Sequence, residues 1–216
     1  EMDYCDWSSD VCSSDLIGAG SRIESVETAI KIKGTGVRSY RGIEIIGKRA
    51  IDNGSSQTTI TGSEIEGQIQ TSAIGEIKIE SSQVGEIEVT GQGRAEITGS
   101  EIAGEKIEVK GSGIIEIEGS EIEIESGIEI GDSGKFVIDG SKINSGKGIS
   151  KKGPESTKII SSEIASGGVG IEIDGGELEI RETKIGSNTD GIVINNNSRA
   201  KMRGVEIGSG KTAIRA

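Results

Sequence analysis

The sequence predicts an all-β solenoid in which short parallel strands stack coil upon coil, and three observations support this prediction. The chain has 216 residues, of which 35 are glycine, one is proline and 2% are aromatic, a composition that is typical of repeat proteins. Isoleucine and valine alternate with polar residues, as a strand requires. One short motif also recurs along most of the chain, which indicates an array of similar units.

The recurring motif has the form Ile-x-Gly/Ser-Ser/Thr-x-Ile, with glutamate once in the third position and valine once in the last, and residues 117–122 represent it well. Seven copies follow this form: 60–65, 79–84, 97–102, 117–122, 138–143, 159–164 and 180–185. A degraded copy occupies 202–207. Successive copies start about 18 to 22 residues apart, and so narrow a period marks stacked supersecondary units. An earlier copy is expected at 32–37, separated by a longer interval from the copy at 60–65.

Each coil is expected to contain three short strands. In the coil around residue 117, each strand turns two isoleucines inward: Ile115 and Ile117, Ile122 and Ile124, and Ile128 and Ile130. Because all units run in the same sense, each strand can pair only with its equivalent in the next coil, which gives parallel sheets. We therefore predict a parallel β-helix of about eight coils over residues 17–216.

The handedness of the helix is predicted from the spacing of the motif. A left-handed form requires an apolar residue at every sixth position and a rigid coil of about 18 residues. In this chain the period drifts between successive copies, which instead favours the right-handed, three-sheet form. An antiparallel meander is the alternative fold, but its two-residue turns are not regularly placed in this sequence.

Residues 1–16 differ from the rest of the chain. They contain both cysteines, Cys5 and Cys12, and the only tryptophan, Trp7. Residues 6–16 resemble the in-frame translation of a sequencing-adaptor oligonucleotide, and a natural Ser- and Asp-rich leader is the alternative. We predict an artefactual or disordered leader over 1–16 and a β-helix over 17–216. No secretory signal precedes the repeat, so we expect the chain to be a piece of a longer protein.

The charge of the chain bears on its partners. The net charge is −12, and the leader supplies five acidic and no basic residues, which leaves −7 for the repeat. An acidic chain disfavours a nucleic-acid partner, because phosphate backbones are bound by basic patches. No apolar run approaches the roughly 20 residues that span a bilayer, so we expect no membrane-spanning segment.

Two columns of polar residues are expected to run along the array. The first comes directly before the second-strand isoleucine: Glu64, Gln83, Glu101, Glu121, Lys142, Glu163, Lys184 and Glu206. The second lies at the preceding corner: Ser63, Ser82, Ser100, Ser120, Ser141, Ser162 and Thr183. We predict a solvated outer face for the first column, with a cation-binding ladder as the alternative. We predict a hydrogen-bonded ladder for the second.

Two segments depart from the repeat and are predicted to be corner loops. Residues 46–57 include Lys48, Arg49, Asp52 and Asn53, and residues 150–156 include Lys151, Lys152 and Pro154. Loops on solenoids often carry recognition, so these segments are the first candidates for a contact surface.

Residues 187–191, Ser-Asn-Thr-Asp-Gly, resemble the Asn-Thr-Asp segment of the polygalacturonase family, in which the aspartate belongs to a catalytic carboxylate cluster. The paired aspartates that the family carries one coil later are replaced here by Lys211 and Thr212, and the chain has no histidine. Hydrolysis of a glycosidic bond requires two convergent carboxyl groups. We therefore predict that Asp190 belongs to a turn and that the chain has no catalytic residue.

No metal, cofactor or sugar platform is predicted. The aspartates that could bind calcium are single residues on different coils or corners: Asp52, Asp132, Asp139, Asp174 and Asp190. After the leader only Tyr40 and Phe136 are aromatic. Phe136 is expected to face inward beside Ile138, and a lone exposed Tyr40 does not form a saccharide-stacking surface.

The Gly- and Ile-rich coils, with turns such as 175–180 and 204–208, resemble the right-handed, pectate-lyase-like β-helix passenger domains of bacterial autotransporters over about residues 23–216. The resemblance implies a rigid, non-catalytic scaffold in the extracellular space or on the bacterial surface, with host or cell-surface macromolecules as partners. The alternative is a polysaccharide-acting enzyme whose catalytic residues lie outside this chain. Uncapped coils expose strand edges, so we also expect end-to-end self-association.

Overall fold

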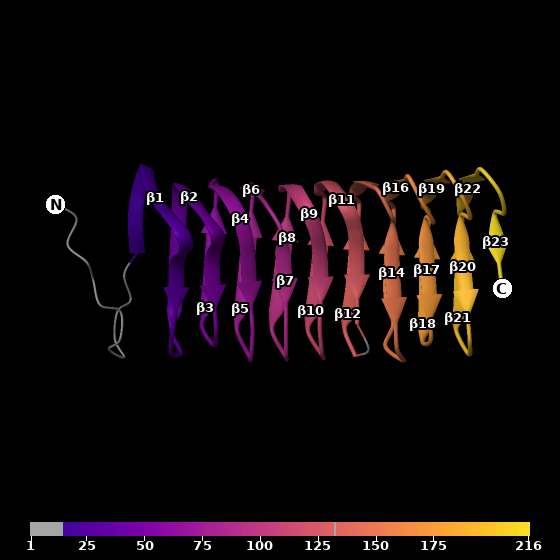
Figure 1. The fold of residues 1–216 in the computed structure, drawn as a ribbon, viewed down its shortest axis with the longest axis horizontal. Coiled ribbons are helices and arrows are strands. Elements are labelled where there is room, and N and C mark those ends of the chain that lie inside the picture. The colour runs from indigo at the N-terminus through magenta and orange to yellow at the C-terminus, as the bar shows by residue number, and fades with distance from the viewer. Residues whose placement is uncertain (1–14, 132) are drawn as a thin grey trace.

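The computed structural model describes residues 15–131 and 133–216, which wind into a straight rod of stacked coils (Figure 1). The described residues form 23 strands joined by turns. The rod contains about nine turns, one more than the eight expected from the repeat. Its first strand begins at Asp15, and residues 1–14 of the predicted leader lie outside the described residues.

The strands form three parallel sheets, which we call first, second and third in the order in which each coil visits them. The first sheet contains β3 (Gln57–Thr61), β5 (Glu76–Glu80), β8 (Arg94–Thr98), β10 (Ile114–Glu118), β12 (Lys135–Asp139), β15 (Thr157–Ile160), β18 (Glu177–Arg181) and β21 (Arg199–Arg203). The second contains β6 (Gln83–Val84), β13 (Lys142–Ser145), β16 (Glu163–Ser166), β19 (Lys184–Ser187) and β22 (Glu206–Ser209). The third contains β7 (Ile87–Val89), β14 (Ile149–Lys152), β17 (Ile171–Asp174), β20 (Ile192–Asn195) and β23 (Ile214–Arg215).

Five longer strands pass from one sheet to the next: β1 (Asp15–Ile32), β2 (Val37–Asn53), β4 (Glu64–Thr71), β9 (Glu101–Val109) and β11 (Glu121–Ile130). The expectation of three separate strands per coil is therefore wrong for these coils. Glycine permits the bend without a break, because Gly67 and Gly127 have φ of 119° and 106°. The added Cβ of any other residue at Gly67 would lie 1.7 Å from the carbonyl oxygen of Gly47.

The predicted repeat sets the register of the first sheet. Ile117 pairs with Ile97 on one side and with Ile138 on the other. The column continues through every predicted copy in both directions, from Ile60 to Met202. Parallel pairing of equivalent residues is therefore confirmed.

The first predicted copy of the motif, at 32–37, is wrong. Tyr40, and not Ile32, pairs with Ile60, so the interval before residue 60 has the ordinary length of the repeat. Ile32 instead pairs with Asn53 at the end of the third sheet. Tyr40 takes the place of an isoleucine in the core column and is 6% exposed, so the expectation that it is exposed is also wrong. Burial raises the pKa of its hydroxyl.

The interior of the rod is a set of apolar columns. Ile117, Ile122 and Ile128 are each at most 2% exposed, and each represents one sheet. Phe136 is fully buried and packs in the core, as predicted. Each buried isoleucine contributes about 1.5 to 3 kcal/mol relative to an exposed one, so the columns supply most of the stabilisation.

Candidate binding surface

The hydroxyl column at the corner between the first and second sheets is an internal ladder. Ser120 is 4% exposed, and its Oγ donates to the carbonyl oxygen of Glu118 at 2.9 Å. The same Oγ accepts a hydrogen bond from the backbone N–H of Ser100, one coil earlier, at 3.2 Å. This pattern repeats from Ser63 to Thr183, with the hydroxyl as both donor and acceptor. The predicted ladder is confirmed, and its hydroxyls bind neighbouring coils.

The charged column on the second sheet lies in register on the outer surface. Lys142 pairs with Glu121 and with Glu163 in the adjacent coils, and all three side chains are exposed. The Nζ of Lys142 lies 3.0 Å from a carboxylate oxygen of Glu121, and that of Lys184 lies 3.9 Å from Glu206. The predicted solvated face is confirmed. Exposed pairs of this kind contribute at most about 1 kcal/mol each.

The expected loop at 46–57 is wrong for most of its length, because β2 continues through Asn53. Asn53 faces inward and is fully buried. Its amide nitrogen donates to the carbonyl oxygens of Ser56 and Glu76, at 3.1 and 3.0 Å, and its amide oxygen accepts from the hydroxyl of Ser56 at 2.5 Å. The break in the repeat therefore marks a buried polar group with its hydrogen bonds satisfied, and not a contact loop.

The expected loop at 150–156 also begins in a strand, β14, and Lys151 points into the core. It pairs with Ile130 and Ile173, which face inward in the adjacent coils, and is 1% exposed. The ammonium group donates to the carbonyl oxygens of Lys152 and Gly153, the latter at 3.3 Å. Only the turn that follows the strand leaves the sheet, so Lys151 is not available to an external partner.

Asp190 lies at a turn, as predicted, but it is only 9% exposed. Its carboxylate forms an ion pair with Arg215 from the next coil, with 3.0 Å between Oδ2 and Nη2. The sequence did not indicate this partner, because the two residues lie in different coils and follow no motif. The pair lacks the second carboxyl group that glycosidic hydrolysis requires.

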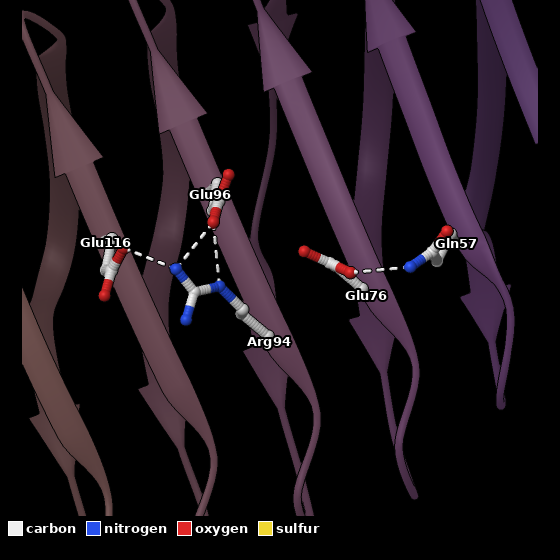
Figure 2. Close-up of polar contacts among 5 residues, drawn as sticks. All are labelled: Gln57, Glu76, Arg94, Glu96 and Glu116. Carbon is white, nitrogen blue, oxygen red and sulfur yellow. Dashed lines mark hydrogen bonds and ion pairs between the residues drawn. The ribbon is translucent and has the colours of Figure 1, made fainter.

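The outer face of the first sheet carries a network of charged side chains in its N-terminal half (Figure 2). The guanidinium of Arg94 lies between two carboxylates, 2.6 Å from Glu96 and 2.7 Å from Glu116. Glu76 instead turns toward Gln57, which donates to it at 3.2 Å. Partial burial alone would lower the pKa of the Arg94 guanidinium. The two carboxylates have the larger combined effect, so this pKa is raised.

The C-terminal half of the same face has the opposite charge. Strands β18 and β21 point Arg181, Arg199, Lys201 and Arg203 outward, and all four are exposed. Lys201 lies 3.7 Å from Glu177. In the part of the chain that the structure describes, Arg199 and Arg203 form no ion pair. We did not identify this basic surface from the repeat motif, because its residues occupy the variable outward positions of the first strand.

The outer face of the third sheet is acidic along much of its length, and Lys106 and Lys110 are paired there with carboxylates. Glu108 lies 2.6 Å from Lys106 and 3.1 Å from Lys110, and Lys110 lies 2.8 Å from Glu88. Burial alone would raise the pKa of Glu108, but the hydrogen bonds from both lysines outweigh it and lower this pKa. The charges of these four side chains are therefore paired with one another.

A surface hollow lies at the corner between the second and third sheets. It has a volume of about 250 Å³, and Glu129, Lys147, Ser150 and Glu172 contribute to its wall. Glu129 and Glu172 pair with Ser150 from either side, so they are two coils apart. The hollow thus brings two carboxylates to one place, roughly 10 Å apart by strand spacing.

Within residues 15–131 and 133–216, no three His, Cys, Asp or Glu side chains gather in a way that could hold a metal ion. Asp132, one of the single aspartates considered above, lies outside the described residues. In the same ranges, no helix has the length and apolar character that a membrane crossing requires.

The family described as "Right handed beta helix region" matches residues 13–216. Because the match covers nearly the whole chain, the protein belongs to this family. The predicted fold class, a right-handed parallel β-helix, is thereby confirmed. No curated protein and no solved structure matches the chain.

Proposed function

We propose that this chain is a non-catalytic β-helical scaffold, secreted or displayed on a bacterial surface in the manner of autotransporter passenger domains and adhesins. Its charged outer faces would contact host or cell-surface macromolecules. The proposal is supported by the observation that the polar side chains at the candidate sites form their contacts within the chain. The serine ladder, Asn53, Lys151 and Asp190 all bind other parts of the chain.

The alternative is a polysaccharide-acting enzyme, and one observation favours it. Glu129 and Glu172 face one hollow, and inverting glycosidases hold their carboxyl groups about 6.5 to 9.5 Å apart. However, Glu172 accepts a hydrogen bond from the amide of Asn195 at 2.9 Å, so part of its hydrogen-bonding capacity is already used. The hollow also has no aromatic side chain in its wall on which a sugar ring could stack.

Incubation of the protein with a panel of neutral and acidic polysaccharides tests both proposals. We expect no release of reducing ends and no unsaturated products above the buffer control. Turnover that disappears in Glu172→Gln and in Glu129→Gln, but persists in the exposed control Glu163→Gln, would overturn the scaffold proposal.

The proposed location is tested on intact cells of the source organism. Antibodies against the coils should label whole cells or the culture medium, and external protease should remove the cell-bound signal. Labelling that appears only after the cells are lysed would contradict an extracellular location.

A further inference from the structure

The outer face of the first sheet from β5 to β21 is long, regular and divided by charge. In β5, β8, β10 and β12 its outward residues include three cations and six anions: Lys78, Arg94, Lys135, Glu76, Glu80, Glu96, Glu116, Glu118 and Asp139. In β15, β18 and β21 they include five cations and two anions: Lys158, Arg181, Arg199, Lys201, Arg203, Glu177 and Glu179. One end thus carries −3 and the other +3.

An apolar stripe separates the two halves of this face. Ile114, Val137 and Ile160 are outward residues of β10, β12 and β15, and all three are half-buried. Val137 lies in the strand after that of Ile114 and is shifted by two residues along it, and Ile160 lies in the same relation to Val137. The stripe therefore crosses the face diagonally. Outward isoleucine and valine thus leave the centre of this charged face less polar than its ends.

We propose that this face joins two copies of the chain in an antiparallel dimer. A two-fold axis parallel to the strands at β12 reverses the rod and places the acidic half of each copy on the basic half of the other. Such an interface is self-complementary and closes at two subunits. With strands about 4.8 Å apart and about five residues long, each copy contributes roughly 550 Å², or about 1,100 Å² in total, which is at the lower end for a specific interface.

The register of this arrangement brings opposite charges together. Strand β5 faces the partner's β21, so that Glu76 and Glu80 face the partner's Arg199 and the partner's Arg203. Among the described residues of their own chain, Arg199 and Arg203 form no ion pair, and Glu76, which accepts a hydrogen bond from Gln57, forms none either. Arg199, Arg203 and Glu76 are therefore available to pair between copies, whereas Glu80 also lies 2.8 Å from Lys78 of its own chain.

Like charges also face each other in this register: Lys78 faces the partner's Lys201, Glu96 faces the partner's Glu179, and Lys135 and Asp139 each face their own counterpart on the axis. The first two pairs carry charges that are already neutralised within their own chain. Lys78 lies 2.8 Å from Glu80, and Lys201 lies 3.7 Å from Glu177. The other two sheets offer no such complementarity. The third-sheet column carries Glu88, Glu108, Glu129 and Glu172, so its charges do not divide into an acidic half and a basic half.

Sedimentation velocity over a range of protein concentrations tests the proposal with two variants. Arg199→Glu/Arg203→Glu has two acidic ends, and Glu76→Arg/Glu80→Arg has two basic ends. We expect the natural sequence to form a weak dimer that dissociates as salt is raised. Each variant alone should dimerise at least tenfold more weakly, and an equimolar mixture of the two should form a heterodimer.

Formation of the heterodimer also shows that both variants are folded. The matched control Lys142→Glu/Lys184→Glu reverses two charges on the second sheet and should leave dimerisation unchanged. A natural protein that stays monomeric at high concentration would overturn the proposal, as would a dimer that survives both reversals or open-ended oligomers from end-to-end stacking. Binding of heparin by Arg199 and Arg203 in a protein that remains monomeric would assign the basic half to a polyanion instead.

Discussion

The coils from β8 to β12 and those from β14 to β21 share one repeat but follow it to different degrees. In the former, the inward positions of the first and third sheets hold only apolar residues, such as Ile97 and Ile117. In the latter, Lys151 and Thr157 take inward positions. Because each coil contacts only its neighbours, a departure in one coil stays local and does not spread along the rod.

The corner between the first and second sheets shows the same contrast. One residue per coil has a positive φ there, and in the middle coils it is glycine, as at Gly119 with φ of 55°. In the C-terminal coils Ser161 and Glu182 adopt φ of 46° and 48°. A side chain in this conformation costs about 1 to 2 kcal/mol. The middle coils therefore have a more favourable interior and corner than the C-terminal coils.

The largest expected effect is the loss of a core position in the middle coils. Ile117→Asp buries a carboxylate in an apolar column and should lower the free energy of unfolding by more than about 4 kcal/mol, or unfold the adjacent coils. Chemical denaturation followed by circular dichroism measures the change. Ile194→Asp, at a half-buried position of β20, should cost less, and Glu118→Ala on the outer face should change stability by under about 0.5 kcal/mol. Equal losses at Ile117 and Ile194 would contradict the contrast between the two regions.

Lys151→Ile should stabilise the C-terminal coils, because it extends a column that already holds Ile130 and Ile173 and removes a buried amine. We expect a gain of about 1 to 2 kcal/mol in the free energy of unfolding, since apolar replacements of buried ionic groups are neutral or stabilising. Lys152→Ala, at the exposed neighbour, is the control and should have little effect. A loss of stability in Lys151→Ile would show that its bonds to the carbonyls of Lys152 and Gly153 hold the corner together.

Thr157→Val replaces a fully buried hydroxyl that has no hydrogen-bond partner with a methyl group of similar size. We expect it to stabilise the protein by about 1 kcal/mol. Thr58 occupies the same inward column, and its hydroxyl lies 3.3 Å from that of Ser56. Thr58→Val should therefore destabilise the protein in the same melting experiment, and a gain in both variants would remove the distinction between the two coils.

The smallest expected effects concern the corner with positive φ. Glu182→Gly relieves strain but adds disorder to the unfolded chain, so we expect a net gain of about 0.5 kcal/mol. Gly119→Ala should lose about 1 kcal/mol at the equivalent corner of the middle coils, where space for the added Cβ is open and only the backbone conformation opposes it. Denaturation midpoints measured side by side check the two signs, and a gain in both would refute the strain argument.

Most of the fold could be predicted from the sequence, because a regular period leaves one way to stack the coils. The partners of Ile117, the serine ladder and the exposed column at Lys142 all follow from equivalent positions in successive copies. The copy at 40–45 was missed because Tyr40 replaces the first isoleucine and Ile43 replaces the serine, which leaves only Gly42 and Ile45 of the motif.

The surface was harder to predict than the core. Outward positions of the first strand follow no motif, and the division into acidic and basic halves appears only when the strands are laid side by side. The pairing of Asp190 with Arg215 likewise joins residues from different coils. Sequence spacing locates repeated contacts, whereas single contacts between coils require the three-dimensional register.

By itself, the sequence determined the strand period, the parallel register and the apolar columns. The reason is physical, since a branched apolar residue at every second position buries its surface only if each coil repeats the one before it. The tertiary structure alone decided which polar residues turn inward where the repeat lapses. Asn53 and Lys151 continue strands that the sequence suggested had ended, because carbonyl oxygens at the corner satisfy their hydrogen bonds in the interior.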